Sequence, residues 1–377
     1  MIESPPFWMY IVGILLLLGP LITVHELGHY VVGRWFGVKS DIFSIGFGRE
    51  LFGWTDRRGT RWRVAAIPLG GYVQFKGDMN PASIPDAEAL ASASPEERAG
   101  SFHCQPLWQR ALIVFAGPAT NLLVTLAIFA SFFAVFGRPV PIDPENSTVV
   151  AEFVEGSAAK DAGVRIGDKI RAIDGEPIVH FSDIAEMVML YPGRQVTLEV
   201  ERAGQQLAIP VTIGASVESD QFGNEARIGR LGFRSGGFEM VPTSVPQALV
   251  ESVDASWGLV RMMATGVAQI VVGDRSIVEL GGPLRIAKYS GEQLSLGLAS
   301  FVNFAALISL NLAFINLLPI PALDGGHLAF YAAEAVRRKP VSPRGMEWAY
   351  RTGVALVLML MVVVTVNDLV ALPIFGS

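Results

Sequence analysis

Charged side chains are scarce in this sequence. Asp, Glu, Lys and Arg make up 17% of its 377 residues, whereas hydrophobic residues make up 51%. Soluble domains carry about 25% charged residues, so a chain that is soluble throughout is excluded. A low charged fraction together with a high hydrophobic fraction is typical of a membrane protein with a soluble part. The net charge of −6 lacks the basic excess that nucleic-acid binding favours, and no nucleic-acid partner is predicted.

Cysteine is almost absent. The single thiol, Cys104, excludes an intrachain disulfide and a zinc site built from several thiolates. The first apolar run also lacks a basic segment ahead of it, so it is expected to be retained rather than cleaved as a signal peptide. A metal site in this chain would have to use His, Asp or Glu.

Long apolar runs are the main feature that is present. Four are long enough to cross a bilayer, at roughly residues 7–30, 107–136, 301–318 and 353–372. A fifth stretch, 255–272, is interrupted by Trp257, Arg261 and Gln269, and is expected to be an amphipathic helix on the insert or the membrane surface. The predicted fold class is therefore a polytopic α-helical membrane protein with four transmembrane helices.

Lys and Arg orient these four spans. They gather in the loops after the first and third spans, and neither terminal tail has one. The positive-inside rule then places both basic loops in the cytoplasm and both termini outside. The long insert between the second and third spans also lies outside.

The inner end of the first span carries His25, Glu26 and His29 within an apolar helix. Residues four apart share a helix face, so both imidazoles can reach one metal ion, while Glu26 stays free to act on a water molecule. The pattern also arises by chance, but a charge at mid-bilayer costs roughly 3 kcal/mol, which favours a function. His103 and His180 lie in loops without metal-like spacing and are expected to be solvated.

A third ligand is expected at the end of the third span. Pro319 and Pro321 must break that helix, and broken helices at membrane depth are tolerated where they line a polar cavity. Asp324 follows at the cytoplasmic end, and the first span runs in the same direction, so Asp324 and the His pair share one level. A plain turn before two glycines is the alternative for Asp324, and His327 is a competing donor.

The remaining segments carry weaker patterns. Residues 61–75 predict β structure turning at Pro68–Gly71, either a plain hairpin or a strand whose open edge pairs with a peptide. Residues 79–100 predict a mobile loop. Residues 117–121, Gly-Pro-Ala-Thr-Asn, suit tight helix packing or a bond to a neighbouring helix.

The external insert resembles a PDZ domain. Residues 155–175 hold a short helix, a Gly-Asp turn and a strand, and residues 196–200 and 207–213 add strands. Residues 228–233 resemble the peptide-binding loop, with a groove formed by Leu231, Gly232 and Phe233. A peptide C-terminus is the expected partner, and a domain that only blocks access by its bulk is the alternative.

Taken together, these motifs resemble the site-2 protease family of intramembrane zinc metalloproteases, in the single-PDZ form of the bacterial regulator of sigma-E protease. The motifs are His25-Glu26-x-x-His29, Gly117-Pro118…Asn121, the PDZ-like insert and Asn316-x-x-Pro319-x-Pro321-x-Leu323-Asp324-Gly325. The resemblance implies one Zn²⁺ per chain on His25, His29 and Asp324, with Glu26 as general base. It implies substrate binding by a set near the broken helix: Asn316, Asn311, Pro319 and Pro321.

The resemblance also implies a cellular role. The substrate would be a single-span membrane protein already trimmed outside, typically an anti-sigma factor, or a remnant signal peptide. The PDZ domain would exclude the untrimmed form, and the enzyme would act in a stress response at the bacterial inner membrane. The best-known members carry two tandem PDZ domains, whereas this chain has one.

Two other classes of function compete. A non-enzymatic scaffold would use the PDZ domain to bind C-termini and the metal as a structural element, but it would not need Glu26. A metal-ion transporter would want ligands on both sides of the membrane midplane, and they occur at one level only.

The expected organisation has eight parts: the first transmembrane helix with the zinc motif (1–37), a cytoplasmic loop with the membrane-associated β-hairpin (38–106), the second transmembrane helix (107–136), the periplasmic PDZ domain (137–236), a linker with the amphipathic helix (237–299), the third transmembrane helix with the Leu-Asp-Gly motif (300–327), a cytoplasmic loop (328–352), and the fourth transmembrane helix with the tail (353–377).

Overall fold

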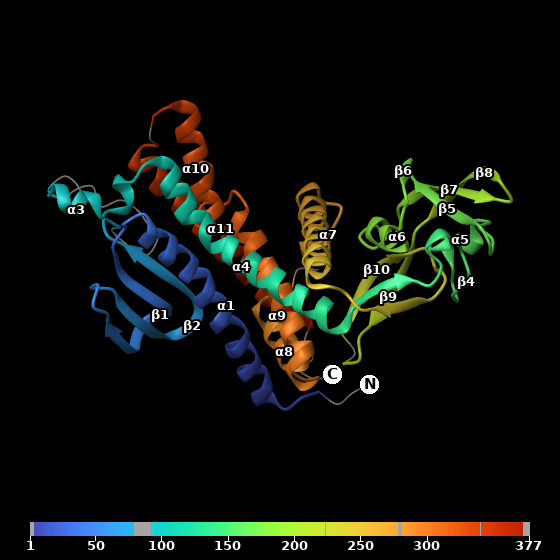
Figure 1. Ribbon diagram of the computed structural model, residues 1–377, viewed down its shortest axis with the longest axis horizontal. Coiled ribbons are helices and arrows are strands. Elements are labelled where there is room, and N and C mark those ends of the chain that lie inside the picture. Colours follow the sequence, from blue (N-terminus) through green and yellow to red (C-terminus); the bar gives the residue numbers. More distant parts are fainter. Residues whose placement is uncertain are drawn as a thin grey trace. The chain divides into compact units, whose positions relative to one another are not determined.

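The structure is a computed structural model that describes residues 4–78, 92, 94–222, 224–277, 281–339 and 341–371. The chain divides into two compact units (Figure 1). We call residues 5–128 and 276–377 the membrane unit and residues 129–275 the insert unit. Most of the predicted mobile loop, 79–100, lies outside the described residues, but its end forms a short helix, α3 (Pro95–Ala99).

Helices dominate the membrane unit: α1 (Phe7–Trp35), the 3-10 turn η1 (Phe102–Cys104), α4 (Leu107–Phe136, whose end enters the insert unit), α8 (Pro283–Ser295), α9 (Leu298–Leu317), α10 (Asp324–Arg337) and α11 (Pro343–Ala371). Runs of Leu, Ile, Val and Ala favour these helices. As predicted, α9 ends just before Pro319. At the other end of the unit, the buried Asp368 of α11 accepts hydrogen bonds from the backbone N–H groups of Gly282 and Arg285, which begin α8.

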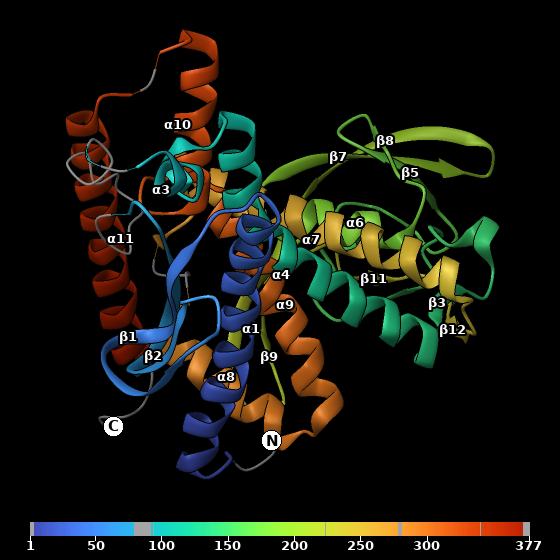
Figure 2. The ribbon, with the colours of Figure 1, turned by 60° about the vertical axis from the view of Figure 1, so that its left-hand side comes forward.

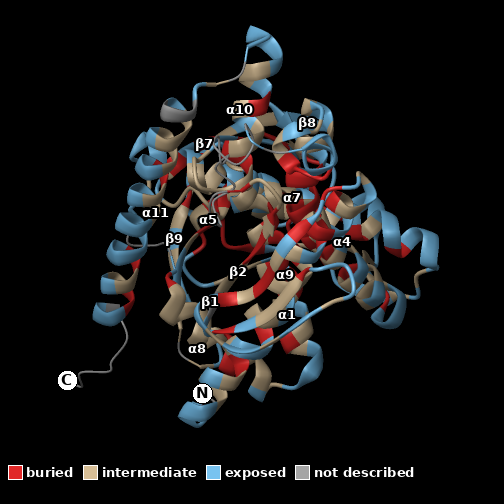
Figure 3. Cartoon of the chain, turned by 90° about the vertical axis from the view of Figure 1, so that its left-hand side faces the viewer, coloured by how far each residue is buried: buried red, intermediate tan, exposed pale blue. Residues whose placement is uncertain are grey.

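Five helices of the described chain are long and apolar enough to cross a membrane: α1, α4, α9, α11 and α7 (Val245–Val272). The outer face of α11 is exposed along most of its length (Figure 3), and it carries Leu356, Leu358 and Val362. Exposed apolar faces of this kind suit lipid rather than water. The protein is a membrane protein with helices and strands. The expected count of four spans, with an amphipathic α7, stays a prediction.

A small sheet lies beside α1 in the membrane unit (Figure 2), formed by β1 (Ser40–Thr55) and β2 (Arg61–Phe75). Ile42 pairs with both Gln74 and Arg61, so the first half of β1 lies between the two halves of β2. The chain of β2 therefore reverses direction near the predicted turn. The two halves do not pair with each other as a plain hairpin would, because β1, which the sequence analysis did not anticipate, separates them.

The insert unit is built mainly of strands. A four-stranded antiparallel sheet has the order β6-β5-β7-β8, and three two-stranded pairs are β3-β12, β4-β11 and β9-β10. The strands are β3 (Arg138–Pro141), β4 (Glu152–Phe153), β5 (Lys169–Ile173), β6 (Glu176–Pro177), β7 (Gln195–Arg202), β8 (Gln205–Thr212), β9 (Gly214–Ser219), β10 (Glu225–Arg230), β11 (Phe233–Arg234) and β12 (Phe238–Val241). Short helices complete the unit: η2 (Pro144–Asn146), α5 (Ala158–Asp161) and α6 (Phe181–Val188).

The core of the insert unit comes from alternating strand residues. Ile170, Leu198 and Val211 are almost completely buried, whereas the residues beside them in the strands are more exposed. This alternation confirms the strands expected at 196–200 and 207–213. The expected peptide-binding loop, 228–233, is shorter than predicted, because Ile228–Arg230 still pair within β10 and only two residues link β10 to β11.

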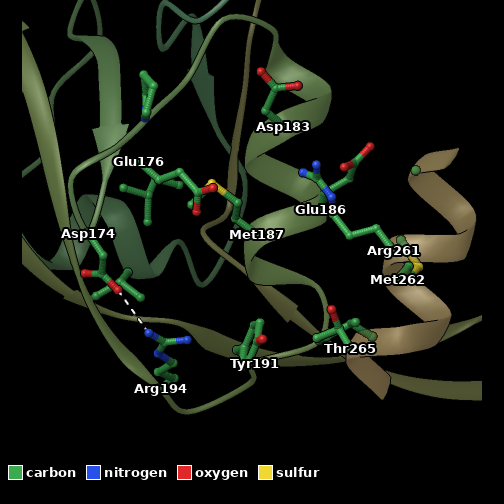
Figure 4. A pocket seen from close by; sticks show the side chains of 15 residues that line it. Asp174, Glu176, Asp183, Glu186, Met187, Tyr191, Arg194, Arg261, Met262 and Thr265 are labelled. Carbon is green, nitrogen blue, oxygen red and sulfur yellow. Dashed lines mark hydrogen bonds and ion pairs between the residues drawn. The ribbon is translucent and has the colours of Figure 1, made fainter. Parts of the chain in front are cut away.

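Helix α7 belongs to the insert unit and contacts other parts of it at two points. Glu251 of α7 forms an ion pair of 2.7 Å with Arg138 of β3, and Gln269 donates a hydrogen bond of 3.0 Å to the carbonyl of Leu190. Between these points α6 and α7 line a pocket of about 530 Å³ (Figure 4). Four carboxylates and two Arg side chains surround it, namely Asp174, Glu176, Asp183, Glu186, Arg194 and Arg261. Two polar contacts, at Glu251 and Gln269, thus join α7 to other parts of the insert unit.

Candidate metal centre

Helices α1 and α10 bring His25, His29 and Asp324 together. The two imidazoles lie one turn apart on α1, and Asp324 is the first residue of α10. The Nε2 atoms of His25 and His29 are 3.3 Å apart. Asp324 Oδ2 lies 3.2 Å from His25 Nε2 and 3.5 Å from His29 Nε2. Within the described chain, this is the one group of His, Cys, Asp or Glu side chains whose donor atoms all lie within 4.8 Å of one another.

The spacing of these three atoms fits a zinc ion. Tetrahedral zinc holds its nitrogen and oxygen ligands at about 2.0–2.1 Å, which places neighbouring ligand atoms about 3.3 Å apart.

The position of the proton on the His29 ring also favours a cation at this place. His29 Nδ1 lies 2.8 Å from the carbonyl oxygen of Ile113, which can only accept, so the proton of a neutral ring sits on Nδ1. The lone pair of His29 Nε2 then faces the Asp324 carboxylate, and a cation between them would relieve the repulsion.

Helix α4 forms the wall opposite the imidazole pair, and Gly117 makes its close approach possible. A Cβ at this position would lie 2.2 Å from His29 Nε2 and 2.8 Å from His25 Cε1. Any larger side chain would therefore enter the space between the nitrogen ligands. One turn further along α4, the amide of Asn121 lies 3.4 Å from His25 Nδ1, and Asn121 is fully buried.

The first turn of α10 folds back against the end of α9, and two glycines permit this. A Cβ at Gly325 would lie 2.2 Å from the carbonyl oxygen of Leu318, and one at Gly326 would lie 2.4 Å from that of Ile320. The connection between the helices includes Ala322 at a φ of 85°, a left-handed conformation that is uncommon outside glycine. This tight turn directs the Asp324 carboxylate toward α1.

Glu26 lies next to the imidazole pair but outside the group of donor atoms. A Cβ at Gly71 would lie 3.1 Å from Glu26 Cγ, so β2 passes directly beside this side chain. The sheet therefore packs against the side chain of Glu26 next to the imidazole pair.

Comparison with known proteins identifies the chain. The model of Peptidase family M50 matches residues 13–360. The chain belongs to peptidase family M50. It is 44% identical over 367 residues to a zinc metalloprotease of Agrobacterium fabrum, covering 96% of each chain. It is 44% identical over 359 residues to one of Rhizobium meliloti (94% and 95% covered) and 36% identical over 390 residues to metalloprotease MmpA of Caulobacter vibrioides (96% of each). The M50 chain is therefore a zinc metalloprotease and, with its apolar helices, a multi-pass membrane protein.

The other three histidines of this M50 chain, His103, His180 and His327, lie outside the group of donor atoms. His327 lies one turn beyond Asp324 on α10 and outside the group of donor atoms. The expectation that His103 is solvated is wrong, because its Nε2 lies 2.8 Å from the buried Asp78 carboxylate. His180 is exposed, as expected.

The predicted substrate-binding residues lie at the end of α9 and after it. Asn311 and Asn316 are half-buried, and within the described chain neither amide has a hydrogen-bond partner. Pro319 is exposed and Pro321 half-buried in the connection to α10. Free amides beside a broken helix are suited to binding an extended backbone.

The three residues of the predicted PDZ groove lie in and after the connection between β10 and β11. Leu231 and Phe233 are buried in the core of the insert unit, and Phe233 packs edge-on against Phe181 of α6. Gly232 has a φ of 82° and lies against Ser157. The peptide groove formed by these three residues stays a prediction.

Helix α4 contributes to the centre in more ways than its sequence specified. The pattern Gly-Pro-Ala-Thr-Asn predicted tight helix packing or a bond to a neighbouring helix, and the structure has packing at Gly117 and a contact between Asn121 and α1, without the partners having been predicted. The contact between Asn121 and His25, and that between the Ile113 carbonyl and His29, were not anticipated. A polar residue one turn after a glycine on an apolar helix was the available sign for Asn121.

Proposed function

We propose that this zinc metalloprotease is an intramembrane endopeptidase whose metal is held by His25, His29 and Asp324. The observation that carries the proposal is the meeting of these three donors, with separations of 3.2–3.5 Å, beside a carboxylate that is not among them. Three protein ligands leave a fourth position for water, which is the arrangement of catalytic rather than structural zinc sites. One ion per chain is the expected stoichiometry.

The residues divide the chemistry between them. Zinc, when bound, polarises a peptide carbonyl and makes a water molecule acidic at neutral pH. Glu26 accepts the proton of that water while the water oxygen attacks the carbonyl carbon. The same carboxyl group then returns the proton to the leaving amine, so that it ends the cycle ionised. Strand β2 passes beside Glu26 at Gly71 and limits the movement of its side chain during both transfers.

The substrate that we propose is a single-span membrane protein. A transmembrane helix hides its carbonyls in hydrogen bonds, so it must unwind before cleavage. The amides of Asn311 and Asn316 can bond the freed backbone where Pro319 and Pro321 break the enzyme's own helix. An anti-sigma factor already cut outside the membrane is the expected physiological substrate, with remnant signal peptides as a second class of the same chemistry.

We propose a topology of four spans in the bacterial inner membrane, with both termini and the insert unit on the periplasmic side. Contacts of α7 support this count. Glu251 and Gln269, 18 residues apart, both bond to polar groups of the insert unit, which a membrane-crossing helix would carry into lipid. The opposite face of α7 exposes Val250, Val253 and Trp257, as an interfacial helix would. The metal centre then lies near the cytoplasmic leaflet.

The insert unit is proposed to act as one PDZ domain that limits which substrates reach the metal centre. The antiparallel strands and the glycine turn at Gly232 support this assignment. Because Leu231 and Phe233 are buried, exclusion by bulk is better supported than side-chain recognition of a peptide C-terminus.

Co-expression with a tagged single-span substrate tests the proposal. The wild-type chain is expected to cleave it, and Glu26→Gln is expected to lose cleavage while keeping its zinc, because Glu26 is not a ligand. Equal cleavage by both forms would refute the proposed role of Glu26. Substrate that is bound but never cleaved by the wild type would favour a non-enzymatic scaffold.

A further inference from the structure

We infer that Asn121 is a positioning residue for the metal centre, which orients His25 and sets the nitrogen that carries its proton. This inference rests on the proposed zinc site. Asn121 is fully buried on α4, and its side-chain amide lies 3.4 Å from His25 Nδ1. The other nitrogen of the same ring, Nε2, faces His29 and Asp324. The ring is thus held between an amide and the candidate ligands.

A neutral imidazole carries one proton, so its two nitrogens must play opposite roles. For Nε2 of His25 to offer its lone pair to a metal, Nδ1 must carry the proton and needs an acceptor. Asn121 Oδ1 has no hydrogen-bond partner among the described residues, while Nδ2 faces the ring. A half-turn of the amide brings Oδ1 to His25, where it accepts the Nδ1 proton.

An amide suits this position better than other polar side chains. It donates to the ring when Nδ1 lacks a proton and accepts from the ring when Nδ1 has one. A carboxylate can only accept, and an aliphatic side chain of similar size does neither. Asn121 can therefore form a hydrogen bond with His25 Nδ1 both before and after metal binding.

The structure also holds Asn121 in place. Its backbone carbonyl accepts hydrogen bonds from Ser309 of α9 at 2.8 Å and from Thr125 at 3.1 Å, and both residues are fully buried. The bond from Ser309 joins α4 to α9 at the turn that faces His25, whereas the bond from Thr125 lies within α4. The Nδ1 atoms of the two imidazoles therefore have different partners. His29 Nδ1 contacts the backbone carbonyl of Ile113, whereas His25 Nδ1 contacts the side chain of Asn121. A side-chain substitution can therefore remove the partner of His25, but not the backbone carbonyl that contacts His29.

Zinc affinity of the full-length chain in detergent tests the inference, measured by competition with a chromophoric chelator. Loss of an outer hydrogen bond to a metal-bound His costs about 10–100-fold in affinity. We expect a loss of this size in Asn121→Leu. Asn121→Asp is expected to stay within about threefold of the wild type, because a carboxylate accepts the same proton. Ser309→Ala, which removes a bond to the backbone of Asn121 only, is the matched control and should also stay within about threefold.

A second readout is the visible spectrum of the Co²⁺-substituted chain, which reports the ligand geometry directly. Asn121→Asp should preserve the wild-type band and Asn121→Leu should shift or weaken it. The inference is overturned if Asn121→Leu binds zinc within about threefold of the wild type. It is also overturned if Asn121→Asp or Ser309→Ala is as weak as Asn121→Leu, since a packing role would then explain the loss. Failure of the wild-type chain to bind zinc would instead refute the proposed metal site.

Discussion

Replacing Gly117 by Ala should destroy the metal centre through one methyl group. The added Cβ would lie 2.2 Å from His29 Nε2, whereas real Cβ contacts essentially never fall below 3.0 Å. The difference, 3.0 minus 2.2 Å, requires the ring or α4 to move by at least about 0.8 Å, but zinc–ligand distances tolerate only about 0.2 Å. We expect zinc affinity to fall by at least about 100-fold, equivalent to about 2.8 kcal/mol.

The assay is chelator competition on the purified chain, together with cleavage of a single-span substrate. Gly19→Ala is the matched control, because Gly19 lies on the same helix as the His pair and has no atom within 4 Å of an added Cβ. The control should bind zinc and cleave like the wild type. A folded Gly117→Ala chain with wild-type zinc affinity would refute the geometry of the centre.

Three further predictions concern separate parts of the molecule. Gly326→Val should lower zinc content, because its side chain would meet the carbonyl of Ile320 and displace α10; zinc analysis of the purified chain checks this. Removing zinc with a chelator should abolish cleavage and lower the unfolding temperature, and added zinc should restore both, since an ion bound only to the folded state stabilises it by about 4 kcal/mol at 1,000 times its Kd. Arg202→Leu should destabilise the insert unit by about 2–3 kcal/mol, because Asp168 is buried and would lose its bidentate partner; hydrogen exchange in β5 and β7 reports the loss. Although burial opposes ionisation of Asp168, bonds from Arg202 hold its pKa below the ordinary value, so this stabilisation should be present above about pH 4 and fall as the pH drops further.

The helical frame and the three donors could be predicted from sequence for clear reasons. Apolar runs without charge mark membrane helices, and the observed bounds of α4, Leu107–Phe136, match the prediction. The positive-inside rule predicted the same direction for the first and third spans, and this expectation placed Asp324 at the level of His25 and His29. Pro319 and Pro321 then fixed where α9 must end.

Contacts across the sequence could not be predicted in the same way. Helix α4 is apolar on all sides, so its sequence does not say which face meets α1, and the partner of Asn121 stayed hidden. The pairing of the first half of β1 with both halves of β2 joins residues that are far apart in sequence, from Ile42 with Arg61 to Ser40 with Phe75. His103 was wrongly expected to be solvated, because its partner Asp78 lies 25 residues earlier. In each case the local pattern allows several partners and tertiary packing selects one.

Zinc-edge X-ray absorption of the full-length chain tests the central claim most directly. We predict only nitrogen and oxygen ligands at about 2.0–2.2 Å, with outer-shell scattering from two imidazoles that falls to one in His25→Ala. A sulfur ligand at about 2.3 Å, or an unchanged imidazole contribution in that variant, would contradict the assignment of His25, His29 and Asp324.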